Sequence, residues 1–563
     1  MKTYDKLQGD ELNNYIDGKV FKGMLSYGLR KLKLDIDRIN DLNVFPIPDG
    51  DTGDNMYSTI LGGYKSIKDL EEENIGKVGA LVRQGMLLGA RGNSGVILSQ
   101  MFAGFTESFD WKEKISLSEF ANAFLSGVKS AYASVSKPVE GTMLTVIREA
   151  AEGAKEFVNG SIVEYLQAYI EKAFISLENT PNLLKDLKEA GVVDSGGAGI
   201  ILIIEGFLAF AKGEKMEELE EVAVTDASKK DSIDFSLFTE DSEMIYGYCT
   251  EFLLQLTNKK TNISAFSLED MKEVLATHGD SIVAVKNGSV VKVHVHTLNP
   301  GAVLTYAQQF GEFLTLKIEN MTLQHNETVE KKAPQTFKKS AVRKPFALVA
   351  VANGDGVISV FKELGADLII DGGQGNNPSV EVFLKAFEAV NADNIFVLPN
   401  NNNIIMAATE AGGIYKDSNI TVIPTKSFGE GYAVLSDLDY TCEDACEIAN
   451  NMLESVKSSK CLMVAKSNRD ASFNGVEVVN GNYIGFCDKT VLTCKQDKIE
   501  CVKDLLNKVD LSNYSFIVTF FGGEVGKEER DALQNYAERE LKDLEFYALE
   551  GGQEIYDFVI VLE

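Results

Sequence analysis

Residues 43–56 read NVFPIPDGDTGDNM, and the interpretation of the N-terminal region starts from this loop. Asp49 and Asp51 flank a single glycine, and two prolines stiffen the approach to them. A pair of carboxylates on a glycine-opened loop suits Mg²⁺, which takes oxygen ligands and shares its shell with water and substrate phosphate. A solvated acidic turn is the competing interpretation. A calcium-binding EF-hand is excluded, because its sixth and twelfth positions, which need glycine and glutamate, would be Asp54 and Ile60.

The sequence around this loop is helical in character. From residue 10 to residue 212, apolar residues recur at spacings of three and four, and no alternating strand pattern interrupts them. Glycine- or proline-containing joints separate the periodic stretches, at 46–53, 89–95, 137–142 and 191–199. The pattern predicts an all-α domain over residues 10–212, with functional loops between its helices.

Two further domains are expected, each preceded by a charged linker. The linkers are residues 213–243 and 329–345. Residues 244–328 combine helical stretches with a strand pair that turns at Asn287, which predicts a small α+β domain with a hairpin. Over residues 346–563 short apolar strands alternate with helices, which predicts an α/β domain with a parallel sheet.

Composition restricts the class of partner. The chain has 563 residues and a net charge of −29. Phosphate backbones are bound by concentrated Lys and Arg, so this charge argues against a nucleic acid partner and against docking on an anionic membrane. The first residues lack an apolar signal segment, and the most apolar run, residues 200–211, is too short to span a bilayer and carries Glu205. We therefore expect a cytoplasmic protein without stable membrane insertion.

Three other loops share features with the acidic loop. GARGNSG (89–95) and GVVDSGGAG (191–199) precede helical runs, and KPVEGTML (137–144) begins one. Small residues there present backbone N–H groups to an anion at a helix N-terminus, and Asp194 and Ser195 are candidate caps. Each loop alone is more often a helix cap, but four in one domain favour a nucleotide site. Neither a P-loop lysine motif nor a strand-first GxGxxG is present, so the phosphate contacts would depend on a metal.

These motifs together resemble a known family. NVFPIPDGDTGDNM, GARGNSGVILSQ, KPVEGTMLTV and VVDSGGAG resemble the ATP-binding L-type domain of dihydroxyacetone kinases, and their order and spacing are closer still to the kinase subunit of bacterial fatty acid kinase. The resemblance continues through YGYCTEF and VKVHVHT into a DegV-like C-terminal half. It implies a multidomain protein with an antiparallel eight-helix barrel that holds ATP and Mg²⁺ at one end.

The resemblance also implies roles for individual residues. Asp49 and Asp51 would hold Mg²⁺ and act in catalysis, with Ser94 as a donor and Arg91 as a charge helper. The residues expected around the nucleotide are Asn43, Thr52, Asn55, Met56, Asn93, Ser94, Gly95, Thr142, Met143 and Asp194. Asp54 departs from the family pattern, which often has threonine there, and its role is left open.

The implied reaction is phosphoryl transfer from ATP to a fatty acid carboxylate, which gives an acyl phosphate for phospholipid synthesis. In the family a separate DegV-type carrier protein presents the fatty acid, and relatives suggest a homodimer. Two alternatives stay open at this point: a small-molecule kinase of the dihydroxyacetone class, and a non-catalytic ATP-binding regulatory protein.

The middle region contains a candidate metal site. His294 and His296 stand two apart in VKVHVHT, so a strand would present both on one face, and Cys249 lies at the start of the same domain. One cysteine and two histidines form an open zinc set, but the spacing alone somewhat favours an ordinary histidine-rich strand face. The resemblance favours zinc at these three residues, with His278 as a spare candidate.

The C-terminal domain has small polar loops after its predicted strands, GGQGNNPS (372–379), PNNNN (399–403) and TKSFGEG (425–431). Ligands bind at such positions in parallel α/β sheets. The DegV likeness concerns the fold, and we predict no binding residues there.

Overall fold

The computed structural model describes residues 15–42, 44–45, 47, 50–214, 248–263, 265–287, 289–320, 335, 337–439, 441–473 and 475–563. The chain divides into two compact units, Met1–Glu220 with Gln335–Glu563, and Glu221–Pro334. The N-terminal helical domain and the C-terminal α/β domain thus belong to one unit. The middle region forms the other and is described by itself.

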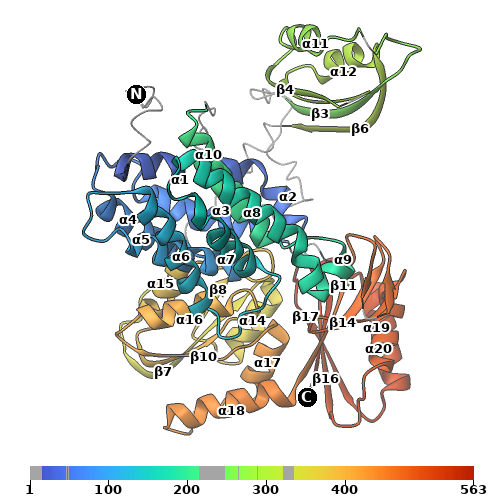
Figure 1. Cartoon of the computed structure of the whole chain (residues 1–563). Helices are drawn as coiled ribbons and strands as arrows, with labels where there is room; N and C mark the ends of the chain where they lie inside the picture. The colour runs from blue at the N-terminus through green and yellow to red at the C-terminus, as the bar shows by residue number, and fades with distance from the viewer. Residues whose placement is uncertain are drawn as a thin grey trace. The chain divides into compact units, whose positions relative to one another are not determined.

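The N-terminal domain is helical, as the sequence predicts. Its helices are α1 (Gly18–Leu34), α2 (Ile36–Asn40), α3 (Thr52–Lys65), α4 (Ile75–Gly89), α5 (Gly92–Glu107), α6 (Leu117–Ala133), α7 (Met143–Ala154), the 3₁₀ turn η1 (Lys155–Phe157), α8 (Ile162–Leu183), α9 (Lys185–Ala190) and α10 (Ser195–Ala211). Figure 1 shows them gathered in one bundle, coloured from blue to green. The eight-helix barrel itself stays a prediction. The expectation of no strands was wrong in one detail, because β1 (Ile16–Asp17) and β2 (Lys114–Ile115) pair antiparallel.

Local signals fix where several of these helices begin. Ser116 and Glu119 form a capping box at α6, and Ser161 and Glu164 form one at α8. At α1 the carboxylate of Asp17 accepts a hydrogen bond from the Val20 amide at 2.9 Å. Each contact satisfies backbone N–H groups that have no partner within the helix.

Aromatic side chains fill the core of the helical domain. The Phe105 ring lies 5.0 Å from Phe109, 5.4 Å from Phe120 and 4.8 Å from Phe124, in edge-to-face arrangements, measured between ring centroids. All four side chains are buried. Edge-to-face pairs add roughly 0.5–1.5 kcal/mol each beyond the apolar area they bury. This core holds α5 and α6 together. It thereby supports the opposite end of α5, where the candidate site lies.

The C-terminal domain begins with the parallel sheet that the sequence predicts. Its order is β10-β9-β7-β8, and all its neighbouring strands run parallel. The elements of this part are β7 (Lys344–Ala352), α14 (Asp355–Glu363), β8 (Leu368–Asp371), α15 (Val380–Val390), β9 (Ala392–Leu398), α16 (Ile405–Ile414), β10 (Asn419–Val422) and α17 (Phe428–Ser436).

A second sheet follows in this domain, and its mainly antiparallel pairing was not anticipated. Its order is β15-β14-β11-β18-β16-β17, with β16 and β17 as the parallel pair. The elements are α18 (Ala445–Ser458), β11 (Lys460–Lys466), β12 (Ala471–Phe473), β13 (Val476–Val478), β14 (Tyr483–Cys487), β15 (Thr490–Lys495), α19 (Lys498–Asn507), β16 (Phe516–Phe521), α20 (Lys527–Glu540), β17 (Glu545–Glu550) and β18 (Tyr556–Leu562).

The middle unit is a four-stranded antiparallel sheet in the order β4-β5-β3-β6, with two helices. Its elements are β3 (Tyr248–Leu256), α11 (Leu268–Leu275), β4 (Asp280–Asn287), β5 (Val290–Thr297), α12 (Pro300–Gln308) and β6 (Gly311–Asn320). A hairpin joins β4 to β5 at Asn287, where the sequence places one. None of the helices in the described parts of the chain has the length and apolar character needed to cross a membrane.

Candidate functional site

The four loops singled out in the sequence all lead into helix N-termini. α3 begins at Thr52, α5 at Gly92, α7 at Met143 and α10 at Ser195. The loop 89–95 is shorter than expected, because Asn93, Ser94 and Gly95 already lie in the first turn of α5. A helix N-terminus carries unpaired N–H groups and the positive end of the helix dipole, so each of these ends favours an anion.

Helices α3 and α10 meet at their N-termini. The hydroxyl of Ser195 donates to the hydroxyl of Thr52 at 3.2 Å. One turn further along, a Cβ atom at Gly199 would lie 2.6 Å from the sulfur of Met56, so the Met56 side chain packs directly on α10 at this glycine. The packing brings Thr52, Met56 and the start of α10 into one place.

Asp194 links α7 to α10. Its carboxylate caps α10 by accepting from the Gly197 amide at 2.7 Å, and the Met143 amide at the start of α7 also bonds it. Burial raises the pKa of Asp194 to about 6, against the lowering effect of these two amides. The carboxyl group therefore exchanges its proton near neutral pH while it holds two helix ends together.

Helix α5 abuts α3 just beyond the acidic loop. Gly92 has a φ of 56°, a left-handed conformation that favours glycine, and a Cβ there would lie 2.4 Å from the side-chain nitrogen of Asn55. Arg91 is the N-cap residue of α5, and its side chain makes no capping hydrogen bond. The expected phosphate residues of α3 and α5 thus lie next to one another.

Asp51 lies at the start of α3 without capping it. The carboxylate is 9% exposed, and its Oδ2 accepts a hydrogen bond from Nδ2 of Asn377 at 2.6 Å. Asp49 and Asn43, the other two expected residues of this loop, lie outside the described residues. Of the predicted pair of acids, the structure therefore places Asp51.

The C-terminal domain contributes to the same place, which the sequence did not indicate. Asn377 comes from the loop between β8 and α15, and its Nδ2 also lies 3.3 Å from Oδ1 of Asn55. Nearby, the Val380 amide donates to the carbonyl of Ala90 at 3.2 Å. The polar loop GGQGNNPS was a weak signal for these contacts, because nothing local shows which distant residues it meets.

A second polar loop of the C-terminal domain meets α5. The side-chain amide of Asn93 donates to the Asn402 carbonyl at 3.5 Å and to Oδ1 of Asn403 at 3.4 Å. Both asparagines belong to the loop 399–403 that the sequence analysis noted without assigning it a role. The first turn of α5, expected to face phosphate, is thus bordered by this loop.

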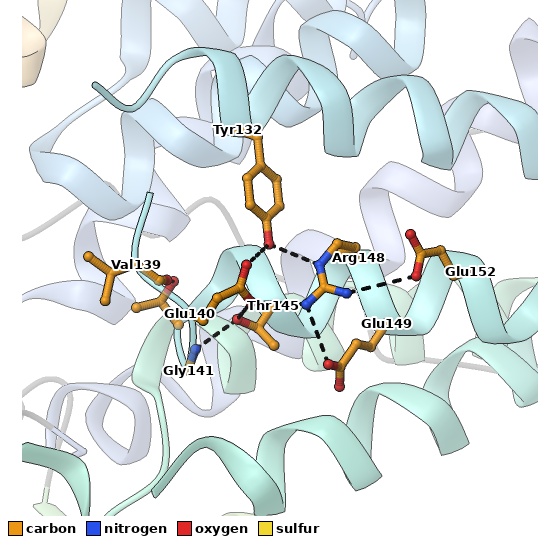
Figure 2. Close-up of polar contacts among 9 residues, drawn as sticks. Tyr132, Val139, Glu140, Gly141, Thr145, Arg148, Glu149 and Glu152 are labelled. Carbon is orange, nitrogen blue, oxygen red and sulfur yellow. Dashed lines mark hydrogen bonds and ion pairs between the residues drawn. The ribbon is translucent and has the colours of Figure 1, made fainter. Parts of the chain in front are cut away.

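A hydrogen-bond network centred on Glu140 fixes the loop 137–142 (Figure 2). Glu140 accepts from the hydroxyl of Thr145 at 2.6 Å, from the guanidinium of Arg148 at 2.9 Å and from the hydroxyl of Tyr132 at 3.0 Å. The Thr145 hydroxyl and then the Arg148 guanidinium hold the pKa of Glu140 below its usual range. This network positions Thr142, the N-cap residue of α7, and Met143, its first residue.

The structure answers the question that the sequence left open at Asp54. Oδ2 of Asp54 accepts from the side-chain amide of Asn40 at 2.7 Å, and Oδ1 of Asn40 accepts from the Gly53 amide at 2.7 Å. Asp54 therefore helps to tie the end of α2 to the start of α3.

The candidate zinc residues lie on neighbouring strands of the middle unit. The Cα register of β3 and β5 places Cys249 opposite His296, with His294 two positions further along β5. The side chains of these three residues are not among those described. Among the side chains that are described, no three or more His, Cys, Asp and Glu residues form a group that could hold a metal. Zinc stays a prediction.

Three family models match the chain in succession. A model of the DAK2 domain matches residues 46–209, a model of the FakA-like fatty acid kinase middle domain matches 245–328, and a model of the FakA-like fatty acid kinase C-terminal domain matches 347–563. An uncharacterized protein of Staphylococcus epidermidis is 39% identical over 556 residues, which cover 97% of this chain and 99% of that protein. An uncharacterized protein of Staphylococcus aureus (strain USA300) is 38% identical over 552 residues, with coverage of 97% and 99%.

Solved structures show more distant likenesses. The dihydroxyacetone kinase from C. freundii in complex with AMP-PNP and Mg²⁺ is 16% identical, with 37% of each chain covered and a TM-score of 0.28. DegV, a fatty acid binding protein from Bacillus subtilis, is 10% identical, with 39% of this chain and 99% of that chain covered and a TM-score of 0.30.

Proposed function

This chain belongs to the FakA-like fatty acid kinase family, and from that premise we propose that it transfers a phosphoryl group from ATP to a fatty acid carboxylate. A separate DegV-type carrier protein presents the fatty acid, and the product is an acyl phosphate for phospholipid synthesis. The observation that carries the proposal is the meeting of the α3 and α10 N-termini at Thr52 and Ser195, with Asp51 one residue before α3.

The residues present fit magnesium and a nucleotide. Asp51 offers a carboxylate oxygen, Asn55 an amide oxygen and Thr52 a hydroxyl oxygen. Such hard oxygen donors suit Mg²⁺. Asp49 joins Asp51 as a magnesium ligand in this proposal. The bound ion supplies neutralisation of phosphate charge, which an acidic protein needs. The N-termini of α5 and α10 supply backbone N–H donors to phosphate oxygens.

The proposed reaction does not require a strong general base. A fatty acid carboxylate is already deprotonated at neutral pH and attacks without losing a proton. Positioning and charge neutralisation then supply the rate enhancement. In this proposal Ser94 and Arg91, at the start of α5, donate to the transferred group, while Met56, Met143 and Asp194 border the nucleotide.

We further propose a zinc ion held by Cys249, His294 and His296. The strand register supports it, because residues directly opposite one another in antiparallel strands have Cβ atoms about 5 Å apart. The homodimer, implied by the resemblance, and the cytoplasmic location, expected from the sequence, remain predictions.

One assay tests the acceptor. The full chain is mixed with Mg²⁺, ATP and either carrier-bound fatty acid or dihydroxyacetone, and ADP release is followed. We expect turnover with the loaded carrier alone. Turnover with dihydroxyacetone would instead favour the small-molecule kinase, and nucleotide binding without turnover would favour a regulatory protein.

The variant Asp51→Asn tests the metal role. We expect the rate of phosphoryl transfer to fall at least about 100-fold, because the variant loses a ligand of the magnesium ion that neutralises charge in the transition state. Asp41→Asn is the control, since Asp41 is an exposed carboxylate at the end of α2. Near-normal transfer in Asp51→Asn, with the control also normal, would refute the assignment.

A further inference from the structure

Asn377 of the C-terminal domain is buried against the start of α3 in the helical domain, where it contacts Asp51 and Asn55. It is 3% exposed, and its Nδ2 donates to Oδ2 of Asp51 at 2.6 Å and lies 3.3 Å from Oδ1 of Asn55. The loop that carries it is held closed, because Gly373 and Asn376 exchange backbone hydrogen bonds of 3.0 and 3.1 Å. Its far end is held by the contact between Val380 and the helical domain described above.

Two amide oxygens at this junction lack a hydrogen-bond partner. Oδ1 of Asn377 and Oδ1 of Asn93 are both buried and unpartnered within the described structure. A buried polar atom left unpaired destabilises the fold, and a native protein retains it where a bound ion, water or ligand supplies the partner. The Asn377 side chain contacts Asp51 and Asn55, and the Asn93 side chain, in the first turn of α5, contacts the loop 399–403. Both observations point to a ligand there.

We propose that Asn377 is a positioning residue of the magnesium–nucleotide site, acting through Asp51. This inference rests on the proposed function and adds a residue from another domain to it. The N–H of Asn377 holds the Asp51 carboxylate in one orientation, as outer-shell hydrogen bonds do for ligating carboxylates in metal sites generally. The site is then built by both domains, and the C-terminal domain contributes directly to metal binding.

The chemistry of the contact favours positioning over inhibition. A blocking residue would be expected to neutralise Asp51, as a lysine or arginine does. Asn377 is neutral and donates a hydrogen bond, so it orients the Asp51 carboxylate without pairing its charge.

The test measures binding, so it does not depend on the acceptor substrate. Affinity of the full chain for a non-hydrolysable ATP analogue is measured by calorimetry, once with Mg²⁺ and once with a chelator. We expect Asn377→Ala to weaken binding in Mg²⁺ by about tenfold or more, the usual effect of losing an outer-shell partner, and to leave binding in chelator unchanged. A general packing defect would weaken both.

Two further variants make the result specific. Asn376→Ala, in the same loop, should bind like the wild-type chain. In an Asp51→Asn background the Asn377→Ala change should have no further effect, because the group it positions is gone. Failure of the wild-type chain to bind would overturn the proposed function, and this inference with it. The inference alone would be overturned if the wild-type chain binds but Asn377→Ala leaves binding in Mg²⁺ unchanged or strengthens it. The same holds if Asn377→Ala weakens binding equally in Mg²⁺ and in chelator.

Discussion

Asp51 and Asp54 lie three residues apart, yet asparagines from different parts of the chain hold them. Asn40, from the preceding helix, donates to Asp54, and Asn377, from the C-terminal domain, donates to Asp51. Both amides are neutral donors, but they connect the loop to different neighbours. Residue type alone gave no way to separate the two acids, and their roles differ because of what the folded chain places beside each.

Asp194 gives the first prediction at the scale of single residues. Its pKa of about 6 lies above the value near 3.9 of an aspartate in an unfolded chain, so the native chain binds more protons between those values. The free energy of unfolding therefore falls as pH rises from about 4 to about 6, by at most roughly 3 kcal/mol. Asp194→Asn cannot titrate and should lack this decline.

The measurement is the melting temperature of both proteins from pH 5 to pH 7.5. The wild-type chain should lose stability relative to Asp194→Asn across the lower part of this range, and the difference should level off above pH 7. Asparagine is about as good an N-cap as aspartate, and any amide contact that it loses changes the stability by an amount that does not depend on pH, so the pH-dependent part of the difference reports the charge. A constant difference across the whole range would show that Asp194 does not titrate there.

At the scale of elements, α1 and α10 pack through a pair of glycines. A Cβ at Gly206 would lie 2.4 Å from both the Cα and the backbone nitrogen of Gly28. Backbone atoms cannot move aside as a side chain can, so the two helices must separate to admit a methyl group. We expect Gly206→Ala to destabilise the helical domain by about 1–3 kcal/mol or more, as overpacking does, despite the better helix propensity of alanine.

Chemical denaturation of the full chain measures this effect. The control is Gly413→Ala in α16, where a Cβ would meet nothing within 4 Å, so only the propensity gain of at most about 1 kcal/mol should appear. If Gly206→Ala left the stability of the helical domain unchanged, α1 and α10 would not be as close as described.

The elements that the sequence predicted are those whose signals are local. The period of 3.6 residues identified the helices of the first domain, and apolar runs between helices identified the parallel strands β7 to β10. The paired strands β1 and β2, two residues each, are too short to show a period. The antiparallel order of the second sheet was missed because pairing such as β11 with β18 joins segments far apart in sequence.

The same distinction applies to the site. Glycine-rich and capping residues indicated a helix start near Thr142, and they marked Asp194 and Ser195 as caps, although α10 begins at Ser195 and not near residue 200. The start of α3 at Thr52 was not predicted. The contact between Asn377 and Asp51 spans 326 positions of sequence, and no local pattern carries information about it. Only the fold brings the two domains' loops together.

At the scale of the whole molecule, the two compact units should respond to different ligands. In our proposal the nucleotide and magnesium bind the unit formed by the helical and C-terminal domains, and the candidate zinc binds the middle unit. A chain of several units unfolds in separate steps when the units stabilise themselves independently. Ligands that bind only the native form of one unit raise the transition of that unit.

We therefore predict two thermal transitions in calorimetry of the full chain. A zinc chelator should lower the transition temperature of the middle unit, because a metal that binds only the folded unit contributes its binding energy to folding. Mg²⁺ with an ATP analogue should raise the temperature of the other transition. Metal analysis should find about one zinc per chain, and Cys249→Ser should lose it. His278→Ala should keep it, since His278 is exposed after α11. Two results would contradict this assignment. A wild-type chain without zinc would show that the metal is absent. A chelator that shifts the nucleotide-responsive transition would show that the metal is bound outside the middle unit.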